Sequence, residues 1–442
     1  MNICMFTNTY YPHVGGVARS VRFFAEDLRK MGHNVLIIAP TFEGYDEKSE
    51  DQEKVLRVPA IQNFNGSDFS VRIALPFLID EKIDEFQPDI IHSNHPFLLG
   101  DAALRAAHRR ELPIVFTHHT RYEDYTHYVP MDSELLKKYV INLATEYANY
   151  CSGVIAPSGS IKKLIAKRGV KKPIKVIPTG VDMDFFKQGN GRDYRNKIDL
   201  SEDTLVIGHV GRLAPEKNLG YLAQSVAKFL KDKDKAVFMI AGSGPDESTI
   251  QQIFKEKNIV DKLVMPGTVK GDELSDFYNA MDIFVFASQT ETQGMVLTEA
   301  MAAGKPVVAL EASGVRDVMR DGENGYMLSE DASAEEFAEA IEKLAGSMED
   351  TEHWQKAALK TANEFSRQNS AQKVEQFYET MIFRKNGTYN FGQKEQDDWE
   401  YIMQMLKTEW ELIAQKARVA KEVIEDTLLA SSKNKEKKGK KD

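Results

Sequence analysis

Short apolar runs separated by stretches of helical periodicity divide the chain into two similar series. The first series comprises 2–7, 35–39, 55–61, 90–93, 114–117, 153–156 and a run that starts at 176, and the second comprises 205–210, 237–241, 263–265, 283–287 and 307–310. Such short, uninterrupted runs are typical of strands buried on both faces of a parallel sheet with helices between them. The pattern therefore predicts an α/β fold built from two doubly wound sheets, whose ligands bind at the carboxyl ends of the strands.

Apolar residues that recur every three or four positions predict the helices. In the first predicted helix, 18–31, this spacing links Val21, Phe24 and Leu28, and Gly32 ends the helix. Further helices are predicted at 135–150, from 219, and at 334–344, 352–365, 370–383 and 393–430. The last one is amphipathic, with charges of both signs on its polar face. We expect it to pack on the enzyme's own surface or on another subunit, with membrane docking as the alternative.

The length of 442 residues exceeds the roughly 250 to 300 at which a single core stops growing, so two domains are expected. We predict an N-terminal domain at 1–185, a second domain at 198–368, a helix at 369–388 that crosses back to the first domain, and a helical extension at 393–442. A hinge is predicted near 179–197, where Gly189 and Gly191 interrupt a polar run.

The net charge of -10 argues against a general nucleic-acid-binding protein. The C-terminal stretch 431–442 differs, because its six lysines and two acidic residues give it a net charge of +4. Such a tail is either a solubilising end or a contact for anionic lipid, at about 1 kcal/mol per basic residue. Two distant cysteines, no signal pattern and no apolar stretch approaching about 18 residues favour a cytoplasmic protein, with attachment to the membrane surface as an option.

The stretch 290–306 follows a predicted buried strand and contains a loop and a helix, which Gly304 and Pro306 end. The loop amides at the helix N-terminus suit an anion or a hydroxyl-rich ligand. On one continuous helix Glu291 and Glu299 would lie about 12 Å apart, at roughly 1.5 Å per residue. Paired glycosidase carboxylates lie roughly 5 to 9.5 Å apart, so two separate ligand-binding acids are the better interpretation.

The spacing Glu291-x7-Glu299, within Thr-Glu-Thr-Gln-Gly and Glu-Ala-Met-Ala-Ala-Gly-Lys-Pro, resembles the donor-site signature of retaining nucleotide-sugar glycosyltransferases of family 4. The alternative is a capping acid followed by a solvated helix acid. The resemblance implies the GT-B architecture, two Rossmann-like domains facing a cleft. It also implies hexose transfer from a nucleotide diphosphate to an acceptor hydroxyl, with retention at the anomeric carbon.

The same resemblance implies roles for residues of the second domain. Arg212 and Lys217, in the string Gly-Arg-Leu-Ala-Pro-Glu-Lys-Asn, stabilise the charge on the leaving diphosphate. Glu299 holds the ribose hydroxyls, and Glu291 holds sugar hydroxyls together with the amides of 292–294. The donor-binding set is completed by Gly242, Thr292, Gln293 and Gly294.

Residues of the first domain face the same ligand in this scheme. Gly15 and Gly16 form a turn after the first strand and line the cleft; without a G-x-G-x-x-G pattern here, NAD and FAD are not supported. His95 and 118–120 follow predicted strands, where a histidine is more often a hydrogen-bonded loop residue. By resemblance His119 contacts the donor sugar near the reacting carbon, with His118 as the control position.

The identity of the acceptor is predicted from weaker sequence features. An aromatic loop contains Tyr122, Tyr125 and Tyr128, which are candidates for an acceptor wall. This loop and the Thr-Glu-Thr-Gln-Gly variant are similar to the bacterial diacylglycerol glucosyltransferase branch, implying UDP-glucose and a lipid acceptor at an anionic membrane surface. A soluble sugar, a different lipid, or a non-catalytic sugar-nucleotide-binding protein stay open as alternatives.

Neither a metal nor a cofactor is predicted, with the nucleotide sugar as co-substrate. The Asp-x-Asp pairs of the chain begin at Asp182 and Asp232, outside the donor motifs, and the two basic residues supply the charge instead. The sequence predicts no particular oligomeric state.

Overall fold

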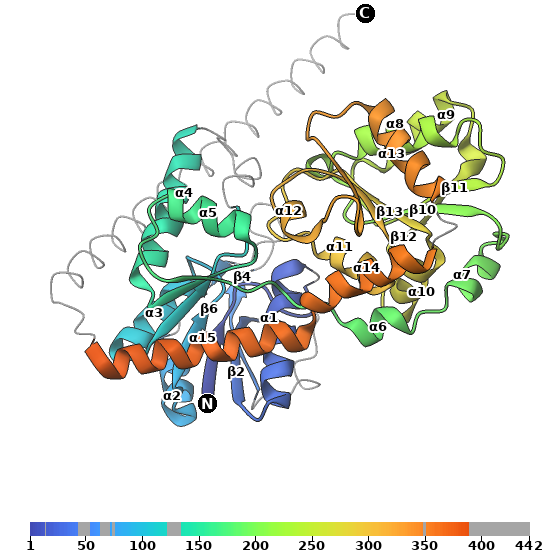
Figure 1. Ribbon diagram of the computed structural model, residues 1–442. Helices are drawn as coiled ribbons and strands as arrows, with labels where there is room; N and C mark the ends of the chain where they lie inside the picture. The colour runs from blue at the N-terminus through green and yellow to red at the C-terminus, as the bar shows by residue number, and fades with distance from the viewer. Residues whose placement is uncertain are drawn as a thin grey trace, which may run out of the picture.

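Two parallel sheets form two lobes of the molecule (Figure 1). The computed structural model describes residues 1–13, 15–42, 54–61, 71–72, 76–121, 134–347 and 351–388. Among these residues the first sheet has seven strands in the order β3-β2-β1-β6-β7-β8-β9, and the second has six in the order β12-β11-β10-β13-β14-β15. The α/β prediction with two doubly wound, Rossmann-like sheets in a GT-B arrangement is confirmed.

The first sheet is covered on both faces by helices. Its strands are β1 (Asn2–Phe6), β2 (Asn34–Pro40), β3 (Val55–Val58), β6 (Ile90–Ser93), β7 (Ile114–Thr117), β8 (Gly153–Ala156) and β9 (Ile174–Val176). In β1, Ile3 and Met5 face α1 (Gly16–Lys30) and α15 (Arg367–Thr388), while Cys4 and Phe6 face the opposite core. That core contains residues of α2 (Pro76–Phe86), α3 (Leu99–Arg109), α4 (Glu134–Tyr150) and α5 (Gly159–Lys167).

The second sheet is likewise buried between two helical layers. Its strands are β10 (Leu205–Val210), β11 (Ala236–Ala241), β12 (Leu263–Gly267), β13 (Ile283–Phe286), β14 (Val307–Leu310) and β15 (Gly325–Leu328). One core contains residues of α8 (Leu219–Leu230), α9 (Glu247–Glu256) and α13 (Ala334–Gly346). The other contains residues of α6 (Met183–Lys187), α7 (Gly191–Lys197), α10 (Asp272–Ala280), α11 (Met295–Ala302), α12 (Val315–Val318) and α14 (Thr351–Glu364).

Each sheet has one point at which the strand order reverses. In the first lobe this switch point lies between β1 and β6, and in the second it lies between β10 and β13. Because the loops after the two central strands leave in opposite directions, a crevice forms at their carboxyl ends, and ligands of doubly wound folds bind there.

The chain crosses between the lobes at two adjacent segments. The Val181 N–H donates to the Phe365 carbonyl (2.8 Å), and the Arg367 N–H donates to the Val181 carbonyl (3.1 Å). Helix α15, orange in Figure 1, then runs across the first lobe and contributes Val374 and Tyr378 to its core. The Arg367 side chain donates to Asp27 at 2.7 Å, and to Glu26 and Asp182 as well, so a charged cluster fixes the crossing point.

One prediction about local structure is wrong. The predicted strand 55–61 ends at Val58, because Pro59 has no N–H for the ladder, and β4 (Ala60–Ile61) pairs instead with β5 (Val71–Arg72). The segment 179–197, near which a hinge was predicted, contains α6 and α7, both packed against α10. The predicted helix 393–430 and the lysine-rich tail lie outside the described residues. Among those that are described, no helix is long and apolar enough to cross a bilayer.

Candidate active site

The loops that follow β10 and β13 meet at the switch point of the second lobe. The Ser288 hydroxyl donates to the Glu216 carbonyl (3.3 Å), which joins the two loops. Lys217 Nζ donates to Glu291 Oε1 at 2.5 Å, and both side chains are about one-fifth exposed, at 22% and 19%. Arg212 pairs with Glu216 and is half-exposed. Both predicted cations therefore lie at the strand ends, each beside a carboxylate with which an anionic ligand would compete.

Glu299 lies in the second turn of α11 and is only 4% exposed. The Tyr278 hydroxyl, from α10, donates to Glu299 Oε2 at 2.8 Å. Arg19, from α1 of the first lobe, donates to Glu299 Oε1. The negative charge of Glu299 raises the pKa of Arg19, while burial raises the pKa of Tyr278 well above its usual value. Glu299 is thus a buried carboxylate with one partner from each lobe.

The side chain of Gln293 is committed to the junction between the lobes. Its Oε1 accepts from the Thr179 N–H (2.7 Å), and its Nε2 donates to the Thr179 carbonyl (2.8 Å). The Thr179 hydroxyl in turn donates to Ser20 in α1 (2.8 Å). What Gln293 offers a ligand is therefore its backbone, as for its neighbours Thr292 and Gly294, which precede α11.

Gly242 follows β11 and permits a close approach of the loop that carries Arg212. Its φ of +147° is a conformation that side chains rarely adopt, and a Cβ would lie 1.8 Å from the Gly211 carbonyl oxygen. The Gly242 N–H donates to the Gly267 carbonyl at 2.8 Å. Gly242 thus lets the backbone after β11 lie close against the backbone after β10, which leads to Arg212.

The glycine turn of the first lobe lies near the N-terminus of α11 in the second lobe. Gly16 begins α1, and a Cβ at Gly16 would lie 4.0 Å from Met295 Sδ, in the first residue of α11. Two helix N-termini, one from each lobe, are therefore close together. Their unpaired amides favour negative charge at this point.

Histidines and asparagines occupy the strand ends of the first lobe. His119, after β7, contacts Asn94, after β6, with 2.9 Å between Nε2 and Oδ1. The Asn8 N–H donates to His95 Nδ1 at 3.1 Å. Burial lowers the pKa of His95 to about 3, and burial together with neighbouring histidines lowers the pKa of His119 well below its usual value. Both imidazoles are neutral at physiological pH.

A buried series of hydrogen bonds connects α15 to β6 and β7. The Tyr378 hydroxyl lies 2.6 Å from His92 Nδ1, and the Thr117 hydroxyl lies 2.6 Å from His92 Nε2. Burial lowers the pKa of His92 to about 3, so this ring is also neutral. The crossover helix thus supports the strand ends that carry Asn94 and His119.

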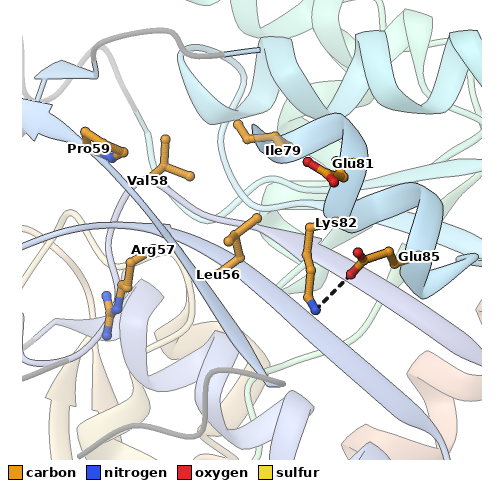
Figure 2. A pocket seen from close by; sticks show the side chains of 8 residues that line it. All are labelled: Leu56, Arg57, Val58, Pro59, Ile79, Glu81, Lys82 and Glu85. Atoms are coloured by element: carbon orange, nitrogen blue, oxygen red, sulfur yellow. Dashed lines mark hydrogen bonds and ion pairs between the residues drawn. The ribbon is translucent and has the colours of Figure 1, made fainter. Parts of the chain in front are cut away.

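Tyr122, Tyr125 and Tyr128 lie outside the described residues. Within the described ranges, no group of three or more His, Cys, Asp or Glu is arranged to hold a metal ion. A cavity of about 250 Å³ lies between β3 and α2, lined by Leu56, Arg57, Val58, Pro59, Ile79, Glu81, Lys82 and Glu85 (Figure 2). None of the predicted site residues lines it, and Lys82 pairs with Glu85 (3.2 Å) at its rim.

Four residues of this site escape the sequence analysis: Asn8, Arg19, Asn94 and Tyr278. Asn94 directly follows β6 and Asn8 lies two residues after β1, so their position was a usable signal. Arg19 and Tyr278 lie within amphipathic helices, where nothing local distinguishes them from surface or core positions. Packing within the second lobe brings Tyr278 to Glu299, and the packing of the two lobes brings Arg19 there.

Comparison with known proteins gives concordant results. Residues 14–185 match the family described as Glycosyltransferase Family 4, and residues 191–361 match Glycosyl transferases group 1. An alpha-monoglucosyldiacylglycerol synthase of Streptococcus pneumoniae is 30% identical over 394 residues, which span 87% of this chain and 87% of that protein. The Acholeplasma laidlawii protein of the same name is 27% identical over 88% of this chain and 100% of its own length. In fold, the crystal structure of Anabaena HepE in complex with UDP matches with a TM-score of 0.70, at 20% identity, over 86% of this chain and 100% of that one.

Proposed function

The chain belongs to glycosyltransferase family 4 and is a nucleotide-sugar-dependent, retaining glycosyltransferase, and on this premise we propose that it transfers glucose from UDP-glucose to 1,2-diacylglycerol. The product would be an α-glucosyl glycolipid. The observation that carries the proposal is the cluster of Arg212, Lys217 and Glu291 at the β10–β13 switch point, beside the buried Glu299.

In the proposed mechanism the two cations act on the leaving group. As the bond between the sugar and the diphosphate breaks, negative charge grows on the diphosphate, and Arg212 and Lys217 release their carboxylates to bind it. Because this interaction is stronger in the transition state than in the ground state, it lowers the barrier. Contact between the lobes excludes water, which would otherwise hydrolyse the activated sugar.

The remaining residues position the donor. Glu299 accepts hydrogen bonds from the ribose hydroxyls, and Glu291 accepts them from sugar hydroxyls once Lys217 has turned to the diphosphate. The amides of 292–294 and the turn at Gly15 and Gly16 complete the donor contacts. His119 lies near the reacting carbon. Gly242 supports the cluster by letting the loop of Arg212 pack closely.

The lipid acceptor is supported by the names of the two curated relatives and by the tyrosines at 122, 125 and 128. A diacylglycerol acceptor places the reaction at a membrane surface, on the cytoplasmic side. The lysine-rich tail fits an anionic surface of this kind. A soluble sugar or a different lipid as acceptor is the alternative, and product analysis separates the two.

The test is incubation with radiolabelled UDP-glucose and diacylglycerol in anionic liposomes, followed by separation of lipid and water-soluble products. We expect a labelled glycolipid from the wild-type chain. We expect Lys217→Ala to lower kcat by about 100- to 1,000-fold, as removal of a charge-stabilising donor does elsewhere.

Lys228→Ala is the matched control, because Lys228 lies on the exposed face of α8 and pairs with Glu335. Both variants should keep the wild-type circular dichroism spectrum and melting temperature to within a few degrees. Near-wild-type turnover in Lys217→Ala would refute the role of this lysine. Label that reaches only soluble acceptors would refute the lipid assignment.

A further inference from the structure

The orientation of the Asn94 side-chain amide is fixed by the backbone of β1. Asn94 is 1% exposed, its Nδ2 donates to the Phe6 carbonyl (3.1 Å), and its own N–H donates to the same carbonyl (2.9 Å). With the amide reversed, two oxygens would face each other in a buried place, which is unfavourable. The amide oxygen of Asn94 must therefore point the other way, toward His119.

This orientation determines which nitrogen of His119 carries a proton. An amide oxygen can only accept a hydrogen bond, and His119 Nε2 lies 2.9 Å from Asn94 Oδ1. Nε2 is therefore protonated. Within the described part of the chain, the His119 ring makes its hydrogen bond to Asn94. His119 is partly exposed.

The charge state of His119 follows from its surroundings. His92 and His95 face it from the end of β6, His118 is its neighbour in the chain, and His13 lies near His95. Burial and these basic neighbours lower the pKa of His119, and within the described part of the chain the charges that act on it are all basic. A neutral ring with its proton on Nε2 has a lone pair on Nδ1, which can only accept.

We propose that Asn94 is a positioning residue that holds His119 as the neutral Nε2–H tautomer, so that Nδ1 accepts a hydrogen bond from a hydroxyl of the donor hexose. This inference rests on the proposed function, in which His119 contacts the donor sugar. The neutral form matters because positive charge develops on the sugar ring as the glycosidic bond breaks. An imidazolium at this point would repel that charge and would have no acceptor for the hydroxyl.

The variant Asn94→Asp tests the proposal. A carboxylate in place of the amide that contacts Nε2 favours the protonated ring and should raise the pKa of His119 above its wild-type value. As the pH falls through the raised pKa, the ring gains a proton on Nδ1 and loses its acceptor. We therefore expect kcat of Asn94→Asp to begin to fall at a higher pH than kcat of the wild type as the pH is lowered.

Asn149→Asp is the matched control, because Asn149 makes the same kind of backbone contacts, to Gly169 and Lys171, far from the strand ends. Its pH profile should match that of the wild type. A profile for Asn94→Asp that matches the wild type, with normal turnover, would overturn the proposal. A uniform loss of kcat at every pH, without this shift, would indicate a purely structural role and would also overturn it.

Nuclear magnetic resonance of the ligand-free wild-type protein provides a readout that does not depend on activity. With 15N-labelled histidine, and His119→Gln to assign the resonance, we expect a pyrrole-type shift for Nε2 and a pyridine-type shift for Nδ1 at pH 7. The reversed pattern or an imidazolium refutes the role of Asn94. If this pattern is found but no glucosyl transfer occurs, the tautomer stands and the proposed function fails.

Discussion

At the residue scale, the sequence predicts which charged residues belong to the site more reliably than it predicts which residues their neighbours contact. Lys217 and Glu291 are 74 positions apart and were both assigned to the donor site, and they form an ion pair. Each follows one of two adjacent parallel strands, so their proximity is implied once the strands are placed. Gln293 differs. Its side chain binds Thr179 because two loops lie close together in the fold. No local sequence pattern encodes that distance.

Replacement of Gln293 tests this structural role. Gln293 and Thr179 are each 5% exposed, and Gln293→Ala would leave the buried N–H and carbonyl of Thr179 without partners. Each unsatisfied group costs roughly 1–3 kcal/mol, so the free energy of unfolding in urea should fall by about 2 kcal/mol or more. The neighbouring Thr292→Ala should change it by less than about 0.5 kcal/mol. Equal stability of the two variants would mean that the hydrogen bonds between Gln293 and Thr179 contribute nothing to stability.

At the scale of elements, the apolar runs that fill a sheet were predictable and the connections were not. The predicted runs 90–93, 114–117, 153–156, 205–210 and 307–310 coincide with strands, because strands buried on both faces leave an uninterrupted apolar signature. Helices α6 and α7 escaped because they are only five and seven residues long. Gly189 and Gly191, near which a hinge was predicted, are both in close contact with α10.

Gly191→Ala tests whether this glycine serves packing. A Cβ at Gly191 would lie 2.3 Å from the Asn279 carbonyl carbon, a backbone atom that cannot rotate away. We therefore expect α7 to shift from α10 and the free energy of unfolding to fall by about 1–3 kcal/mol. Gly346→Ala, at the end of α13, is the control, because its Cβ would meet nothing within 4 Å. A flexible linker at 189–191 would instead tolerate both substitutions equally.

At the scale of the whole molecule, side-chain contacts connect the first lobe to α11 and α12 of the second lobe. Arg19 of α1 pairs with Glu299 of α11. Asp317 of α12 accepts hydrogen bonds from Gly159 (2.7 Å) and Ser160 (3.2 Å), in the first turn of α5. The fold class was predictable from the series of strands. The cross-lobe contacts were not, because they join surfaces that each look like ordinary helix faces in the sequence.

The ion pair between Arg19 and Glu299 should hold the lobes together in the absence of nucleotide. Its carboxylate is buried and its guanidinium is one-third exposed, so removal of Arg19 leaves a buried charge without this partner and should cost more than the roughly 1 kcal/mol of a solvent-exposed pair. One kcal/mol changes a population ratio about fivefold. In Arg19→Ala the ligand-free molecule should therefore sample open arrangements more often, with a larger radius of gyration in small-angle X-ray scattering. Arg22→Ala is the control, because Arg22 pairs with Glu26 within α1 and leaves the second lobe untouched. Arg19→Lys keeps the charge, so its radius of gyration should lie between those of Arg19→Ala and the wild type. If the scattering curves of Arg19→Ala and Arg22→Ala superimpose, contact between the lobes does not depend on the pair of Arg19 and Glu299.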